Sequence, residues 1–140
     1  MKSPSISQCQ LIALPKIQDG RGCLSFVEQG SQIPFEPSRF FYLYEMPEGS
    51  VRGGHAHKQC HQFIIGMAGA FDLEIDDGKN KQTIHLSDPA TGMHVPPGIW
   101  CNLSHFSESS IVAVLASDKY DESDYLRDYD SFLQYKELAQ

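Results

Sequence analysis

Short apolar runs separated by turn residues constrain the fold of this chain more than any other feature. From about residue 8 to residue 116, stretches of strand length are alternating or wholly apolar, and no helical periodicity appears between them. The connecting segments contain Gly, Pro, Asn or Asp, and Asp77-Gly78 in IDDGKN is the strongest hairpin signal. This spacing predicts an all-β chain folded as an antiparallel sandwich or barrel. The predicted strands are QLIALPKI, CLSFVEQ, FFYLYEM, HQFIIGMA, AFDLEID, KQTIHL, GMHVP, IWCNLSHF and SIVAVLAS.

The C-terminal stretch has a different pattern. Leu126, Tyr129, Phe132 and Leu133 recur near helical spacing, and Asp121 suits the start of a helix, where a carboxylate meets exposed amides. One helix over about 121–138 is therefore predicted. At 140 residues the chain has the length of one ordinary domain, so we expect a single domain over 1–140.

Charge and composition exclude several classes of partner. The formal net charge is −7 at pH 7 without any basic run, whereas nucleic-acid binding requires a basic face. A few arginines can still hold an anionic small ligand in an acidic protein. The sequence shows neither an apolar stretch that spans a membrane nor the features of a signal peptide, and its four cysteines lack CxxC pairing. We expect free thiols, a cytoplasmic location, and neither nucleic-acid nor membrane partners.

The stretch RGGHAHKQCHQ contains the main candidate for chemistry. Residues two apart in a strand point to the same face, so His55 and His57 project together. Such a pair can bind a metal, transfer protons or make structural hydrogen bonds. Its spacing to Gln62 and Gly69 has the form of the first cupin motif, and GMHVPPGIWCN has the form of the second, with Cys101 in place of the usual histidine. The motifs predict a cupin, a jelly roll of the double-stranded β-helix type.

The substitutions in these motifs weaken the metal-binding interpretation. A cupin metal site uses imidazoles and a carboxylate, but here Gln62 replaces the carboxylate and Cys101 replaces one imidazole. Two histidines and a cysteine can hold zinc with an open position, so a metal site stays as an alternative. Imidazole exchanges protons near neutral pH, and we expect the pair to do so without a metal or other cofactor.

Four segments together resemble the dTDP-sugar 3,4-ketoisomerases, a branch of the cupin superfamily. They are RGGHAHK, FDLEIDDG, PPGIW and VLASDKYDESDYLRDY, and the resemblance covers about residues 19–132. It implies an isomerase that moves the keto group of dTDP-4-keto-6-deoxyglucose from carbon 4 to carbon 3, on the way to 3-amino sugars of surface polysaccharides. Such a reaction needs a base, a stabilised enediol and proton delivery to carbon 4, and consumes no redox cofactor.

The resemblance also implies catalytic roles. His57 is the expected base and His55 its partner, although the two assignments can be exchanged. Tyr42 is the expected phenol that assists proton transfer or polarises the ketone, with Tyr44 close behind on the same strand face. Strand alternation alone leaves open whether that face looks inward.

A set of substrate contacts follows from the same resemblance. Arginine suits the diphosphate, tryptophan offers a flat surface for a base or sugar, and glutamine suits a sugar hydroxyl. We expect Arg127 to make a structural ion pair instead. The expected substrate-binding residues are Arg21, Arg52, Tyr44, Gln62, Trp100, Cys101 and Cys23.

The cysteines and the assembly complete the expectations. Cys23 and Cys101 depart from the residues common at their positions, so the galacto and gluco configurations at carbon 4 both stay open. Likeness to the family implies a homodimer that shares an N-terminal strand. Two alternatives remain beside the isomerase: a metal-dependent cupin enzyme, such as an oxygenase or sugar-phosphate isomerase, and a non-catalytic cupin that binds sugar nucleotides.

Overall fold

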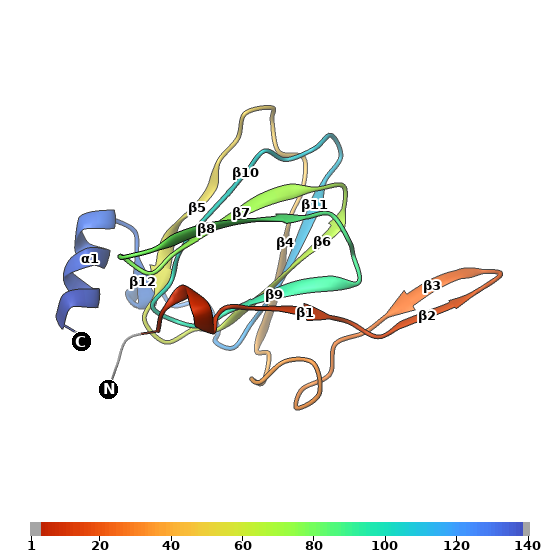
Figure 1. Cartoon of the computed structure of the whole chain (residues 1–140), viewed down its shortest axis with the longest axis horizontal. Coiled ribbons are helices and arrows are strands. Elements are labelled where there is room, and N and C mark those ends of the chain that lie inside the picture. The colour runs from red at the N-terminus through yellow and green to blue at the C-terminus, as the bar shows by residue number, and fades with distance from the viewer. Residues whose placement is uncertain (1–3, 139–140) are drawn as a thin grey trace.

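Two five-stranded antiparallel sheets face each other in the structure, a computed structural model that describes residues 4–138 (Figure 1). The first sheet has the order β1 (Gln10–Ala13), β9 (Thr91–Val95), β6 (Gln62–Ala68), β11 (Ile111–Ala116) and β4 (Arg39–Leu43). The second has the order β12 (Tyr125–Leu126), β5 (Arg52–His57), β10 (Trp100–Ser104), β7 (Phe71–Asp76) and β8 (Lys81–Leu86). The all-β prediction is confirmed. KQTIHL coincides with β8, the run QLIALPKI divides between β1 and the next strand, and the other predicted strands are present with shifted ends.

The main core lies between the sheets and follows from strand alternation. Leu73 and Ile75 of β7 are fully buried, and so is Val112 of β11 on the opposite sheet. Asp72 and Glu74, which alternate with these residues along β7, lie on the outer face of the sheet. Burying each large aliphatic side chain contributes about 1.5–3 kcal/mol, so these inward faces hold the two sheets together.

A second, smaller core covers the outer face of the first sheet. Phe63 and Ile65 of β6 point away from the main core and pack with Leu14, Ile33 and Phe35. The segment that precedes β4 therefore lies over this sheet and closes it from solvent on that side.

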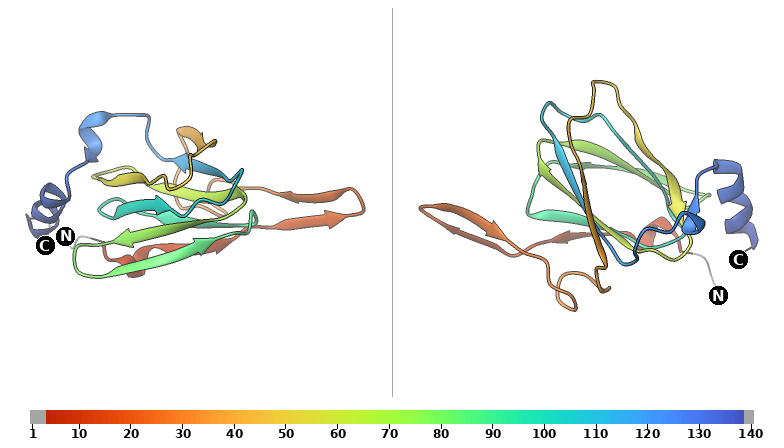
Figure 2. Two further views of the ribbon diagram at one scale, coloured as in Figure 1. Left: turned by 90° about the horizontal axis from the view of Figure 1, so that it is seen from above. Right: turned by 180° about the vertical axis from the view of Figure 1, so that it is seen from behind.

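A hairpin of β2 (Lys16–Asp19) and β3 (Gly22–Ser25) projects from one end of the sheets, and helix α1 (Tyr129–Leu138) lies at the other (Figures 1 and 2). All the strand residues of the hairpin are exposed. Within the described residues, no helix has the length and apolar character that crossing a membrane requires.

The C-terminal helix begins at Tyr129, so the prediction of a helix from about residue 121 is wrong in its first part. Asp121 caps only a 3-10 turn, η2 (Glu122–Asp124), by accepting the N–H of Ser123 at 3.0 Å. The chain then extends as β12, whose residues Tyr125 and Leu126 pair with β5. Pairing with the edge of β5 satisfies the backbone groups there, and this tertiary contact outweighs the helical periodicity of the sequence.

Candidate active site

A cavity of about 330 Å³ opens between the two sheets at the face that carries His55. Its apolar wall comes from strands of both sheets and consists of Phe41, Leu43, Ile64, Leu103 and Val114. Its polar groups are Arg52, His55, Gln62, Cys101, Tyr125 and Arg127. An enclosed apolar site with a few convergent polar groups is the usual form of a small-molecule site.

The two glycines before His55 shape the strand that carries it. Gly53 has a φ of +86°, and a Cβ there would lie 2.8 Å from the carbonyl oxygen of Cys101. The pairing of β5 with β10 shifts at this point, between Cys101 and Asn102. Gly53 permits both the close approach and the left-handed backbone, so that His55 pairs opposite Cys101 and both face the cavity.

The two histidines are neighbours, as predicted, but they lie at different depths. Their ring centroids are 5.1 Å apart and their planes nearly perpendicular. His55 lines the cavity, whereas His57 lies deeper and is 5% exposed. The ring of Tyr125 packs against both, with centroid distances of 5.0 Å to His55 and 4.3 Å to His57.

Burial keeps both imidazoles neutral near pH 7. Desolvation, helped by the neighbouring His57, lowers the pKa of His55 to about 4. Desolvation also lowers the pKa of His57, although a hydrogen bond to Asp124 opposes the effect. Neutral imidazoles have a free lone pair, so both rings are in the state that accepts a proton.

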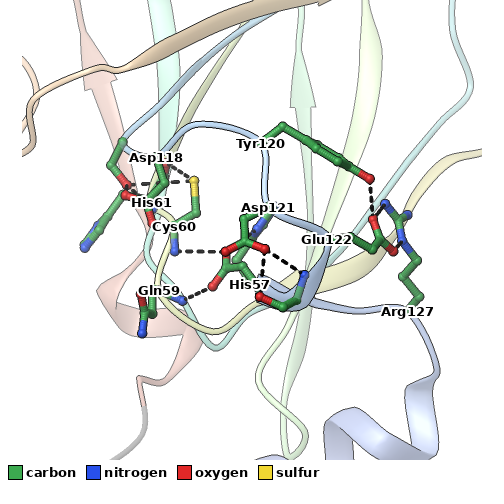
Figure 3. A network of polar contacts seen from close by, with 12 residues as sticks. His57, Gln59, Cys60, His61, Asp118, Tyr120, Asp121, Glu122 and Arg127 are labelled. Carbon is green, nitrogen blue, oxygen red and sulfur yellow. Dashed lines mark hydrogen bonds and ion pairs between the residues drawn. The ribbon is translucent and has the colours of Figure 1, made fainter.

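Positive charge lies at the same cavity. Arg52 and Arg127 both line it. Arg127 donates to the carboxylate of Glu122 at 2.5 and 3.0 Å, and Tyr120 donates to the same carboxylate (Figure 3). The guanidinium carbon of Arg127 also lies over the ring of Tyr125, 4.3 Å from the ring centroid. The predicted ion pair of Arg127 is therefore present, and the same side chain also faces the cavity.

Two further predicted residues lie in the cavity wall. Gln62 on β6 is 6% exposed, and Cys101 on β10 is 4% exposed. Burial raises the pKa of the Cys101 thiol, so it stays protonated. A neutral amide and a neutral thiol provide hydrogen-bonding and packing surface to a ligand, not charge.

The structure does not bring the predicted tyrosines to the cavity, which corrects the expectation for Tyr42 and Tyr44. Both lie on the outer face of the first sheet and are 55% and 57% exposed. The inward positions of the strand belong to Phe41 and Leu43. The strand alternates as predicted, and the face with the tyrosines, whose direction the sequence left open, is the outer one.

Three other predicted contacts also lie elsewhere. Trp100 faces away from the cavity and packs against Phe132 of α1, with ring centroids 5.6 Å apart, because successive strand residues point to opposite faces. Arg21 and Cys23 lie in the projecting hairpin, where Arg21 pairs with Asp19 at 2.8 Å. Neither is among the residues that line the cavity of this chain.

Sequence reasoning missed three residues from the segment after β11. Asp124 contacts His57, while Tyr125 and Arg127 line the cavity. The sequence predicts a helix over this segment, with an ion pair for Arg127, and so predicts no cavity residues here. The signal was present: Tyr125 and Arg127 are two residues apart, the spacing that places side chains on one face of an extended segment.

One group of potential metal ligands lies beside the cavity. Single donor atoms of His57, Cys60 and Asp124 all lie within 4.8 Å of one another. The carboxylate of Asp124, however, already interacts with Nδ1 of His57 at 2.9 Å and accepts the backbone N–H groups of Gln59 and Cys60 at 2.7 and 3.3 Å. These donors use the lone pairs that a metal would need, so the group fits a hydrogen-bonded pair better than a metal centre.

Comparison with known proteins identifies the family. The family model described as FdtA, WxcM-like, C-terminal, matches residues 7–137. The TDP-4-oxo-6-deoxy-α-D-glucose-3,4-oxoisomerase of Aneurinibacillus thermoaerophilus is 40% identical over 90% of this chain and 91% of its own length. The chain belongs to the dTDP-sugar 3,4-ketoisomerases.

Solved ketoisomerases share the fold over nearly the whole chain. QdtA of Thermoanaerobacterium thermosaccharolyticum, solved with TDP, superposes with a TM-score of 0.92 at 31% identity and covers 96% of this chain and 98% of its own. The TDP-quinovose 3,4-ketoisomerase WlaRB of Campylobacter jejuni has a TM-score of 0.88 at 38% identity, with coverage of 92% and 99%. This ketoisomerase is thus an isomerase with a cupin-like fold, and the resemblance seen in the sequence is confirmed.

Proposed function

We propose that this ketoisomerase binds dTDP-4-keto-6-deoxyglucose in the cavity and converts it to the 3-keto isomer by metal-free acid/base catalysis. The observation that carries the proposal is the pair of buried, neutral imidazoles beside a cavity that also holds two arginines. The curated relative is named for the same substrate, and QdtA was solved with TDP.

The reaction requires only proton transfers. One proton moves from carbon 3 to carbon 4, and one moves from oxygen 3 to oxygen 4, through an enediol. The carbonyl at carbon 4 becomes a hydroxyl as the hydroxyl at carbon 3 becomes a carbonyl, so no electron donor or acceptor is consumed. Positioned general acid/base groups contribute about 10²–10⁴-fold to such a rate.

The depths of the two histidines favour exchanging the roles expected from the sequence. Because His55 lines the cavity, we assign it to the proton on carbon 3 and its return to carbon 4. His57, deeper and with its ring 5.1 Å away, exchanges the hydroxyl proton. Arg52 suits the diphosphate, since a guanidinium binds phosphate oxygens in a bidentate manner. Arg127, which binds Glu122 through two of its nitrogens, adds positive charge beside the diphosphate. Gln62 and Cys101 then border the sugar.

The free cysteines support a location for this reaction. All four, Cys9, Cys23, Cys60 and Cys101, are free thiols. Unpaired thiols persist in a reducing compartment, and we propose that the enzyme works in the cytoplasm.

We expect turnover of dTDP-4-keto-6-deoxyglucose in heavy water to yield the 3-keto product with deuterium at the carbons that exchange protons. The reason is that a base that takes a carbon-bound proton can exchange it with solvent before returning it. NMR of the sugar ring identifies the product and the labelled carbons. A sugar-nucleotide-binding cupin would leave every ring proton in place, and that outcome would reject the proposed activity.

The same assay separates the metal-dependent alternative. Protein treated with a chelator should keep the rate of untreated protein, because the proposed proton transfers use imidazole alone. A rate lost to the chelator and restored by one divalent ion would favour a metal enzyme.

We also propose that the enzyme is a homodimer in which the β2–β3 hairpin of each copy reaches the other. The hairpin exposes Ile17 and Leu24, which are 58% and 57% accessible. Exposed apolar side chains on a projecting hairpin are typical of strands that pair with another chain. The sequence predicts that Arg21 and Cys23 contact the substrate, and in that arrangement the hairpin carries both of them to the second copy.

Replacing Ile17 and Leu24 together with aspartate should raise the dimer dissociation constant at least about 100-fold, because each loses about 1.5–3 kcal/mol of apolar burial per copy. Sedimentation equilibrium measures this constant. Leu138→Asp, at an 87% exposed position of α1, is the matched control and should leave it unchanged. A wild-type chain that sediments as a fully active monomer would exclude the dimer.

A further inference from the structure

The carboxylate of Asp124 is held beside His57 by an unusually complete set of contacts. Its oxygen Oδ2 lies 2.9 Å from Nδ1 of His57, and the two side chains are only 11% and 6% exposed. The backbone N–H groups of Gln59 and Cys60 donate to the same carboxylate at 2.7 and 3.3 Å. Each of these donors occupies a lone pair of the carboxylate, which therefore acts as the acceptor in these contacts.

The backbone fixes this carboxylate relative to the catalytic strand. Lys58 donates its N–H to the carbonyl oxygen of Asp124 at 2.9 Å, and β12 pairs with β5 so that Tyr125 lies opposite His57. The strand that carries both histidines therefore also fixes the position of Asp124. Movement of the aspartate away from His57 would require breaking this pairing.

The Asp124 oxygen beside Nδ1 already accepts the N–H of Cys60 and acts as an acceptor, so the contact determines the tautomer of His57. Nδ1 must carry the hydrogen, and Nε2 keeps the lone pair. Nε2 of His57 is buried and meets no hydrogen-bonding atom of the described chain, and the same is true of Nδ1 of His55. The basic nitrogen of His57 is thus on the side of the ring away from Asp124, and its lone pair is not used by the described chain.

We infer that Asp124 is a positioning residue for the proposed ketoisomerisation, acting through His57 without touching the substrate. The inference rests on the proposed function and adds to it a residue that orients one of the two histidines. Asp124 holds His57 as the Nδ1–H tautomer and stabilises the imidazolium that forms when Nε2 takes the hydroxyl proton. When His57 returns that proton to oxygen 4, the neutral tautomer is restored.

A second pair in the chain provides a matched comparison. Nδ1 of His85 lies 2.8 Å from a carboxylate oxygen of Asp72, nearly the same distance. That pair is exposed, with His85 63% accessible, and lies on the outer face of the second sheet. The other oxygen of Asp72 lies 3.1 Å from Nδ1 of His105, so substitution of Asp72 tests the loss of His–Asp contacts away from the cavity.

The test compares Asp124→Asn with Asp72→Asn. Asparagine keeps the size of the side chain but can donate to Nδ1 and stabilise the opposite tautomer of His57. We expect Asp124→Asn to lower kcat by about 10²–10⁴-fold, the range between loss of an orienting partner and a fully wrong tautomer, with KM changed less than about threefold. Asp72→Asn should keep wild-type kcat. Asp124→Glu should recover part of the loss, since the carboxylate is retained.

Nitrogen NMR of protein labelled at histidine reads the tautomer directly and without substrate. We expect His57 of the wild type to carry its hydrogen on Nδ1 and to lose this preference in Asp124→Asn, while His85 keeps its own. Circular dichroism confirms that the variant is folded.

Wild-type kcat in a folded Asp124→Asn protein, or an unchanged His57 tautomer, would overturn the inference. Failure of the proposed function looks different. In that case the wild type would not isomerise the sugar nucleotide, while the NMR comparison would still decide whether Asp124 sets the tautomer.

Discussion

Replacing His55 with asparagine is expected to lower kcat for ketoisomerisation by about 10²–10⁴-fold, with little change in affinity for dTDP. His55 lines the cavity and is neutral near pH 7, so it is available to take the carbon-bound proton. Asparagine has a similar shape but cannot accept and return that proton. His57→Asn should cause a loss in the same range, because the second proton transfer then has no base.

Steady-state kinetics with binding of dTDP by calorimetry separates the chemical loss from a binding loss. His85→Asn, on the outer face, is the control and should keep both parameters. The acid limb of kcat should extend down toward the pKa of His55, about 4, because the base acts in its neutral form and is lost as the pH falls through that value. Full turnover by His55→Asn would remove this residue from the mechanism.

Phe63→Ala is expected to lower the free energy of unfolding by about 3–5 kcal/mol, the largest stability effect we anticipate from a single substitution. Phe63 is fully buried in the smaller core on the outer face of the first sheet. Its ring lies against the backbone of Gly92, where a Cβ would come within 2.2 Å of the ring. Truncation therefore removes both apolar burial and a close contact, and leaves a cavity.

Denaturation by urea at one fixed protein concentration measures this loss, since formation of the proposed dimer would make stability depend on concentration. Leu138→Ala, at an exposed position, should change stability by less than about 0.5 kcal/mol. Gly92→Ala should also destabilise, but less in the Phe63→Ala background, because the clashing ring is gone. Equal effects of Gly92→Ala in both backgrounds would contradict the contact.

Much of the fold could be predicted because strand alternation and turn residues are local signals. The alternating pattern of FDLEID and the Asp-Gly turn after it specify β7 and its hairpin to β8 without reference to the rest of the chain. The cupin spacing likewise placed His55, Gln62 and Cys101 around one cavity. Along each of their strands, side chains that point inward alternate with side chains that point outward. These three residues occupy inward positions and therefore share one cavity.

The remainder depends on contacts between distant segments. Which face of β4 looks inward is decided by the opposing sheet, and the sequence alone could not choose between Tyr42 and Phe41. The spacing of apolar residues around Tyr125 predicts a helix, but the segment pairs as a strand with the edge of β5. Asp124 was missed for this reason, since its role exists only after that pairing forms.

The position of β12 at the end of the chain has a consequence for synthesis. The ribosome completes both histidines and all the strands of the first sheet before it reaches the residues that close the back of the cavity. Asp124, Tyr125 and Arg127 are therefore synthesised after the strands that carry both imidazoles. A chain truncated between residues 117 and 123 would keep His55 and His57 but would lack the carboxylate beside His57 and the edge strand that pairs with β5.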